Sequence, residues 1–545
     1  MTLRLTWTQP EDLLGHELRQ AQEDGRTPTA LAHRWLTSGG HPPPTRAGAS
    51  PTPAPPHLRA LAQELLTELA SVRSPLADAE PTELGAIEIL TSGQGLTQKP
   101  EDEKSGSPDP ETPQFQPGRG SDHASDRTAQ PNPAPFQPGR RLRPRREAPT
   151  KPGRRLRPEA RSADPGSGGE APGSATHPAR RGLGASPEDS GRGGVGEEEK
   201  QLHAAWLGRA AGCLLGKPVE KLPLEGIRAI GKATDNWPLK TWFTAKGLPQ
   251  EIKAAHPWNR RSRTTSLAEN INGMPEDDDL NYPLLNLLLL ERRGKSFTTT
   301  DVAKLWLDEL PAGRTFTAER IAYRNLLKGL EPPHTATHHN PFREWIGATI
   351  RADIHGWTNP GNPKEAAAQA HRDATLTHTA NGVYGAMFTA AIIAAAAEHP
   401  TIHQAIEAGL ATIPPNSRLA QAIQAARETA RTTPDWDDAV DKLHARYNAH
   451  HWVHVIPNTA LTTAALTHAD GDFADSITKT VSGGWDTDSN GATAGSVTAL
   501  LAGSPEALPP HWTKPLKNRL ATSIAGLDGI GFDELARRTR EVRTR

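Results

Sequence analysis

Two short stretches of the chain place several carboxylates directly before an apolar or small-residue segment. The first, Glu276 to Asp279, leads into the leucine-rich run at 284–290. The second, Asp486 to Ser489, follows Gly483 and Gly484 and leads into a run of small residues. Burying unpartnered carboxylates costs free energy, and a divalent cation removes that cost because Mg²⁺ and Ca²⁺ prefer oxygen ligands. Together the two stretches predict an oxygen-lined cage of the kind that holds two divalent ions.

Each stretch also has a purely structural interpretation. The run Glu276 to Asp279 suits the first turn of a helix, where negative side chains complement the helix dipole. The run Asp486 to Ser489 suits an Asx-rich turn with a helix N-cap. Small residues follow it and allow a close helix contact; they are Gly491, Ala492, Ala494, Gly495 and Ser496. Residue types alone leave these interpretations open beside the metal cage.

The elements that must position these residues are helices. Beyond residue 201, apolar residues recur every three or four positions. This pattern predicts helices over 202–215, 284–291, 300–310, 365–374, 383–398, 402–411, 419–432, 459–467, 473–481 and 492–501. No segment shows the alternating pattern of a strand between turn signals. We therefore predict an all-α, compact multi-helix domain over 201–545.

Two further regions precede this domain. Residues 1–91 are predicted to form a short helical N-terminal extension with its clearest helix over His57 to Val72. The leucines on one face of that helix are Leu58, Leu61, Leu65, Leu66 and Leu69. A lone helix of this length is marginal in water, so we expect it to pack on the main domain or on a partner.

Residues 92–200 are rich in Pro, Gly, Ser and Arg and poor in large apolar residues, which predicts a disordered linker. The Gln-Pro-Gly-Arg element at 116–119 recurs at 137–140. The linker is interpreted as a solvated spacer; the alternative is a basic tether for nucleic acid or an acidic partner. No aromatic residues alternate with its arginines for base stacking, which argues against nucleic acid.

The composition excludes several classes of function. The net charge of -1 provides no overall field for nucleic acid or an anionic membrane. A single cysteine excludes an intramolecular disulfide and fits a reducing compartment. The first residues lack the apolar core of a signal peptide, and no apolar run is long enough to span a membrane. These features predict a cytoplasmic protein.

Three segments resemble motifs of the ADP-ribosylglycohydrolase family, which includes dinitrogenase reductase-activating glycohydrolase. Residues Gly208 to Glu220 resemble its Gly-x-x-x-Gly-Asp-Ala-Leu-Gly-x-Pro-x-Glu helix, with Cys213 in place of the Asp. Residues Glu276 to Asp279 resemble its Thr-Asp-Asp-Thr motif, with acids in place of both threonines. Residues Gly483 to Ser489 resemble its Gly-Gly-Asp-x-Asp-Thr/Ser motif, with one residue inserted. The departures indicate a divergent subgroup.

The resemblance implies an all-α fold, two Mg²⁺ ions (or Mn²⁺) and hydrolysis of a glycosidic bond to ADP-ribose or a related ribosyl nucleotide. The residues that it implies as metal ligands are Glu276, Asp277, Asp278, Asp486, Asp488 and Ser489. For the acid–base step on water it implies Glu220, Glu276 and Asp278. The expected partner is an ADP-ribosylated substrate or an ADP-ribose-like small molecule, and neither nucleic acid nor a membrane is expected.

Six residues are predicted to bind the substrate: Arg351, Asp353, His378, Asn381, Gly483 and Gly484. Arg351 would clamp a diphosphate with its guanidinium fork; the alternative is an ion pair with Asp353 or Glu344. His378 lies in a Thr-His segment that resembles one near the ligand in the family; the alternative is a buried structural histidine.

Two other functions remain open. One is hydrolysis of a small N-ribosyl compound of specialised metabolism. The other is an inactive ADP-ribose-binding module, and metal content distinguishes it from an enzyme.

Overall fold

The computed structural model describes residues 8–50, 52–92, 195–398 and 401–545. Within these ranges the regular secondary structure is helical, and the only β contacts are isolated bridges. The predicted all-α fold is therefore confirmed. The predicted linker lies outside the described residues except at its ends, and its last six residues belong to a helix.

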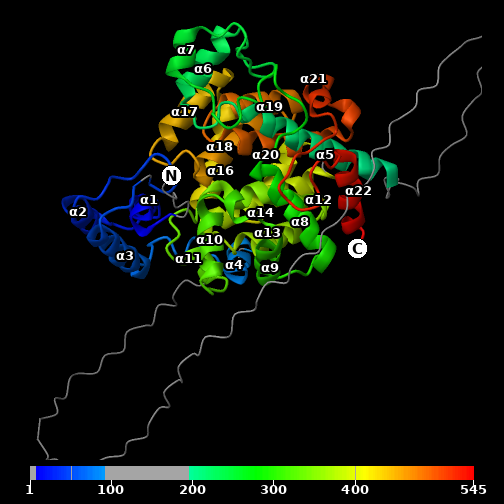
Figure 1. The fold of residues 1–545 in the computed structure, drawn as a ribbon. Coiled ribbons are helices and arrows are strands. Elements are labelled where there is room, and N and C mark those ends of the chain that lie inside the picture. The colour runs from blue at the N-terminus through cyan, green and yellow to red at the C-terminus, as the bar shows by residue number, and fades with distance from the viewer. Residues whose placement is uncertain (1–7, 51, 93–194, 399–400) are drawn as a thin grey trace, which may run out of the picture. The chain divides into compact units, whose positions relative to one another are not determined.

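Figure 1 shows the arrangement of the helices. Their bounds are α1 Pro10–Glu23, α2 Thr29–Thr37, α3 Pro56–Ser71, α4 Leu84–Thr91, α5 Val195–Gly216, α6 Leu224–Ala233, α7 Gln250–Ala255, α8 Asp278–Arg293, α9 Thr299–Glu309, α10 Thr317–Leu327, α11 His334–Thr337, α12 Asp353–Trp357, α13 Pro363–Ala374, α14 Ala380–Ala396, α15 Ile402–Leu410, α16 Arg418–Thr432, α17 Trp436–Tyr447, α18 Val455–His468, α19 Phe473–Ser482, α20 Thr487–Ala502, α21 Pro510–Thr513 and α22 Phe532–Arg543. Short 3₁₀ helices span Ala312–Arg314, Ile346–Arg351, Pro505–Ala507 and Lys514–Leu516.

Helices α5 and α20, which carry the first and third sequence motifs, pack closely against each other. A Cβ built on Gly212 would lie 1.8 Å from the carbonyl oxygen of Gly491. A Cβ on Gly208 would lie 2.3 Å from the carbonyl oxygen of Gly495, so glycine is required at both positions. The order of these contacts makes the two helices antiparallel. The C-terminal end of α5 therefore meets the N-terminal end of α20.

The leucine-rich helix α8 and the alanine-rich helix α14 lie in the core. Nearly every residue of α14 is buried, which explains why it has apolar side chains on all sides rather than one stripe. Helix α8 is buried from Asp279 to Leu290. Its first turn, which carries the acidic run, is therefore held by the packing of the turns that follow.

Helices of the N-terminal extension pack onto the same compact unit. The expected helix over 57–72 is present as α3, and its leucines pack into the common hydrophobic core. Charged contacts add to this interface: Arg343 donates to Glu17, with Nη1–Oε2 at 2.8 Å. Arg418 donates to Glu80, with Nη2–Oε2 at 2.6 Å. The extension thus contributes to the core.

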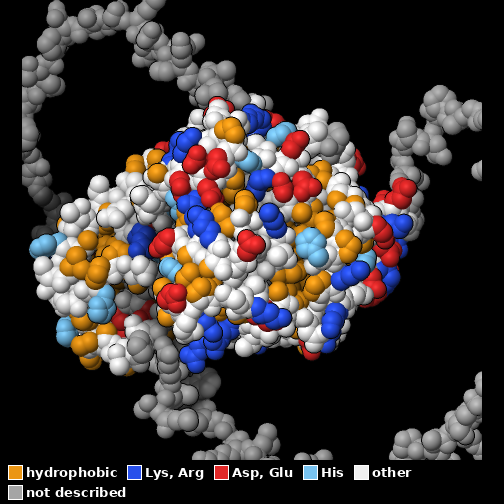
Figure 2. Space-filling model, turned by 90° about the horizontal axis from the view of Figure 1, so that it is seen from above, with side chains coloured by type: hydrophobic (Ala, Val, Ile, Leu, Met, Phe, Trp, Pro, Cys, Tyr) orange, Lys and Arg blue, Asp and Glu red, His pale blue; other side chains and the backbone are white. Residues whose placement is uncertain are grey.

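The face in Figure 2 carries acidic and basic side chains interspersed rather than gathered by sign. None of the helices in the described ranges is long and apolar enough to cross a membrane.

Candidate metal centre

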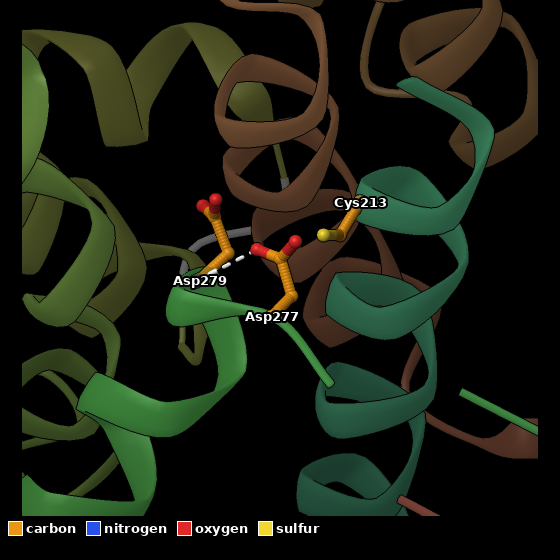
Figure 3. A group of neighbouring side chains, drawn as sticks. All are labelled: Cys213, Asp277 and Asp279. Carbon is orange, nitrogen blue, oxygen red and sulfur yellow. Dashed lines mark hydrogen bonds between the residues drawn. The ribbon is translucent and has the colours of Figure 1, made fainter. Parts of the chain in front are cut away.

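The acidic run begins at the N-terminus of α8. Asp277 is the N-cap, in an extended backbone conformation, and its carboxylate accepts a hydrogen bond from the Asp279 backbone N–H at 3.0 Å. This is the usual role of aspartate at a helix start. Figure 3 shows the Asp277 carboxylate facing the Cys213 thiol on α5, with Asp279 beside it. The N-cap thus fixes which acids of the run face α5.

The second acidic motif begins at a turn anchored on both sides. The Asp486 backbone N–H donates to Asn458 Oδ1 at 3.1 Å, and Thr487 Oγ1 donates to the Gly216 carbonyl at 2.9 Å. The inserted residue, Trp485, has a left-handed φ of 57°. These contacts hold Asp486 and Asp488 against the end of α5.

The three sequence motifs meet at this junction of α5, α8 and α20. Two groups of possible metal ligands lie there, and within each group one ligand atom per residue lies within 4.8 Å of the others. They are group A, Cys213, Asp277 and Asp279, and group B, Glu220, Asp486 and Asp488. Ser489 Oγ donates to Asp279 Oδ2 at 3.1 Å, so α20 also contacts group A.

The carboxylates of this centre repel one another when ionised. Burial, and then the charges of Asp277 and Glu220, raise the pKa of Asp278 to about 8. Burial also raises the pKa of Asp486 and Asp488, and negative neighbours raise both further. Such a site is stabilised by added positive charge, as a divalent cation would supply.

One buried oxygen is particularly suited to such an ion. Asp279 Oδ1 is buried and has no hydrogen-bond partner among the described residues. The nearest cationic group is Arg209, with Nη2 at 3.6 Å. Burial, then the charge of Asp277, raises the pKa of Asp279. The donor set, mainly carboxylate oxygens, therefore fits Mg²⁺ or Mn²⁺.

Basic side chains neutralise part of the centre. The Lys217 ammonium contacts the Asp277 carboxylate and is nearly buried. Burial opposes ionisation of Asp277, but this ammonium lowers its pKa below the usual range. Lys221 contacts Glu220 at the more exposed edge. Arg209 donates to Asp353 Oδ2 on α12 at 2.7 Å and to the Asp279 carbonyl at 2.9 Å, and so joins α12 to the start of α8.

Of the six expected metal ligands, Asp277, Asp486 and Asp488 belong to these groups, and Ser489 contacts group A through Asp279. Glu276 and Asp278 belong to neither group. The Glu276 carboxylate pairs with Arg314, with Nη2–Oε2 at 2.7 Å, and accepts from Asn281 Nδ2 at 3.3 Å. Asp279, which had no predicted role, takes part instead. Lys217 likewise had no predicted role, although it stands one helical turn after Cys213.

Four of the six expected substrate residues, Arg351, Asp353, His378 and Asn381, are fully buried and bonded to other groups of the fold. Arg351 is fully buried, and its guanidinium donates to Asp373 at 2.6 Å and to Glu319 at 3.0 Å. Nη1 also donates to the Gly347 carbonyl, and Nη2 donates to the Asp373 carbonyl and the Thr377 hydroxyl. No donor is left for a diphosphate, and the ion-pair partners are neither Asp353 nor Glu344.

The other three residues are buried in a similar way. Asp353 is fully buried against Arg209. His378 is fully buried, with Nδ1 2.6 Å from the Thr377 hydroxyl. Asn381 donates to Glu80 at 2.8 Å and to Glu344, and accepts from the Leu419 backbone N–H. The contacts of Asp353 and Asn381 thus connect separate helices.

The two glycines lie beside the centre. Gly484 has a φ of 84°, a conformation that suits glycine. The His444 ring donates to the Gly483 carbonyl, with Nε2–O at 2.8 Å, and stacks on Trp485 at 4.1 Å between ring centroids. Gly483 and Gly484 therefore shape the turn that presents Asp486.

Comparisons with known proteins identify the domain that carries this centre. The family model for ADP-ribosylglycohydrolase matches residues 197–544, which include all three motifs. Among solved structures, one described as an ADP-ribosylglycohydrolase-related protein complex covers 64% of this chain and 99% of its own. It is 19% identical, with a TM-score of 0.40. No curated protein matches the chain.

Proposed function

Because the chain belongs to the ADP-ribosylglycohydrolase family, whose members are glycoside hydrolases, we propose that it hydrolyses a glycosidic bond to ADP-ribose or a related ribosyl nucleotide. The reaction depends on Mg²⁺ or Mn²⁺ at the junction of α5, α8 and α20. One observation carries the proposal: the acids of three motifs far apart in sequence meet there in groups A and B. An inactive binding module would have no need to keep so many buried acids together.

The carboxylates of Asp486 and Asp488 would hold the metal, and group A lies beside them at the same junction. A divalent cation there supplies Lewis-acid polarisation of a ribose hydroxyl or of water. The surrounding carboxylates favour the positive charge that develops on the ribose in an oxocarbenium-like transition state. The chain's own contribution is therefore to orient the sugar and to stabilise charge.

Glu220 is the residue that we assign to take the proton from water. Its side chain is 17% exposed, which leaves it open to water at the edge of the centre. Asn259 Nδ2 donates to its Oε2 at 2.6 Å and fixes the direction of the carboxylate. Asp278, whose pKa of about 8 lets it carry a proton at neutral pH, is the second acid–base residue. Glu276 is held by Arg314 and has no such role.

The test measures release of ADP-ribose by chromatography from a panel of ADP-ribosylated proteins, nucleic acids and small ADP-ribosyl compounds. We expect turnover with Mg²⁺ or Mn²⁺, and loss of turnover on chelation. Glu220→Gln should lower kcat by about 100-fold or more, the usual range for removing a general base. Glu225→Gln, an exposed change on nearby α6, is the matched control. Turnover that persists after complete chelation, or equal rates in both variants, would contradict the proposal.

A further inference from the structure

Lys217 is the least expected member of the metal centre. Its side chain is only 8% exposed, and its ammonium contacts the Asp277 carboxylate and lies 3.4 Å from the Glu276 carbonyl oxygen. It belongs to the segment that follows α5, directly after the glycine that meets α20. A lysine buried this deeply must be paired with negative charge. Here the charge that pairs with it is a group A carboxylate.

The ammonium competes with a cation for group A. In a two-metal site the ions lie about 3.5–4 Å apart and share carboxylate ligands. In this centre a second ion would therefore need oxygens of the 276–279 motif as well as those of the 486–489 motif. In group A, one of the two carboxylates already accepts from Lys217. An added divalent ion on the same Asp277 carboxylate would face the positive charge of the ammonium at close range.

The third member of group A does not compensate for this loss. Cys213 is fully buried and provides sulfur, which suits Mg²⁺ poorly because that ion prefers oxygen. Group B, in contrast, consists of three carboxylates. Among the described residues its one ion pair is with Lys221, which is 41% exposed.

We propose that the Lys217 ammonium takes the place of one of the two cations that the family resemblance implies, so that the centre binds a single divalent ion in group B. Lys217 is then a fixed positive charge on the group A side of the centre. It holds the Asp277 carboxylate and provides N–H donors where a second ion would provide a Lewis acid. The inference rests on the proposed function, because it assumes that the centre binds a metal.

The experiment counts Mn²⁺ on the full-length protein. Equilibrium dialysis followed by elemental analysis gives the number of ions per chain, and electron paramagnetic resonance distinguishes an isolated Mn²⁺ from a coupled pair. We expect one ion per chain with the signal of an isolated ion. Lys217→Met removes the ammonium and keeps the length of the side chain, and should bind two ions with a coupled signal. Lys232→Met, an exposed change on α6, should still bind one ion.

The outcomes separate the two proposals. A wild-type chain that binds two coupled ions overturns the single-ion inference and leaves the proposed function intact. A chain that binds no Mn²⁺ overturns the proposed function itself. A folded Lys217→Met protein that still binds one ion shows that Lys217 does not exclude the second. If Lys217→Met fails to fold, Lys217→Arg keeps the charge and should bind one ion, and two ions there would also overturn the inference.

Discussion

Removing one carboxylate from the centre should stabilise the metal-free protein. Asp486 is 7% exposed, and burial, then the charge of Asp488, raise its pKa well above 3.8. An aspartate whose pKa is raised by folding contributes stability below pH 3.8, and this is lost as pH rises toward the folded value. At pH 7 this loss of stability has an upper limit, because the folded protein can bury the aspartate in its protonated form. Protonating a carboxyl group of pKa 3.8 at pH 7 costs about 4 kcal/mol.

Asp486→Asn removes this pH-dependent cost, since an amide does not ionise. In metal-free protein, we expect the free energy of unfolding in urea to rise by up to about 4 kcal/mol at pH 7. The gain should fall below about 2 kcal/mol at pH 5, where only 1.2 units remain. Asp308→Asn, an exposed change on α9, is the control and should change little.

The metal provides an independent arm of the same test. Mg²⁺ or Mn²⁺ should raise the Tm of wild type more than that of Asp486→Asn, because an ion that binds only the folded state stabilises it in proportion to its affinity. A variant that is less stable than wild type without metal at pH 7, or a gain that does not change between pH 5 and 7, would refute the reasoning.

Two further predictions concern the interface of the N-terminal extension. Burial lowers the pKa of His16 to about 3 and of His451 to about 2, so both remain neutral in the fold. Acidification from pH 7 to 5 should therefore lower the free energy of unfolding by about 2 kcal/mol for each histidine, because only the unfolded chain takes up the proton. In His16→Phe the measured free energy of unfolding should depend less on pH. Arg418→Ala leaves Glu80 and Glu344 buried without their ion-pair partner, which should lower the unfolding free energy in urea by about 3–5 kcal/mol, and an unchanged urea midpoint would contradict this.

The helical architecture could be predicted because its signal is local. The expected helix over 473–481 is α19, Phe473–Ser482, and the one over 300–310 is α9, Thr299–Glu309. In both, an acidic or hydroxyl N-cap precedes a periodic apolar face. Helix α17 was not predicted, although Asp435 caps its N-terminus and its buried residues Ala439, Val440, Leu443 and Tyr447 recur at helical spacing.

The role of Arg351 could not be predicted for a different reason. A guanidinium that binds a diphosphate and one that joins two helices use the same donors and the same planar geometry. The distinction lies in the partners, and here Glu319 comes from α10 and Asp373 from α13. Neither is near Arg351 in sequence, so no local pattern indicates that its donors are already used.

Within the acidic run 276–279, the sequence predicts a cation site but not the direction of each side chain. Four consecutive acids from Glu276 indicate a cation site, but they do not indicate which of them face it. The helix start decides this: Asp277 is the N-cap, so Asp279 turns into the centre while Glu276 stays in the preceding segment and reaches Arg314. Once Asp277 also pairs with the Lys217 ammonium, the run no longer supplies free carboxylates at every position. In the single-ion proposal, the number of ions bound depends on Lys217, sixty residues before Asp277 in sequence, which the acidic motif alone does not reveal.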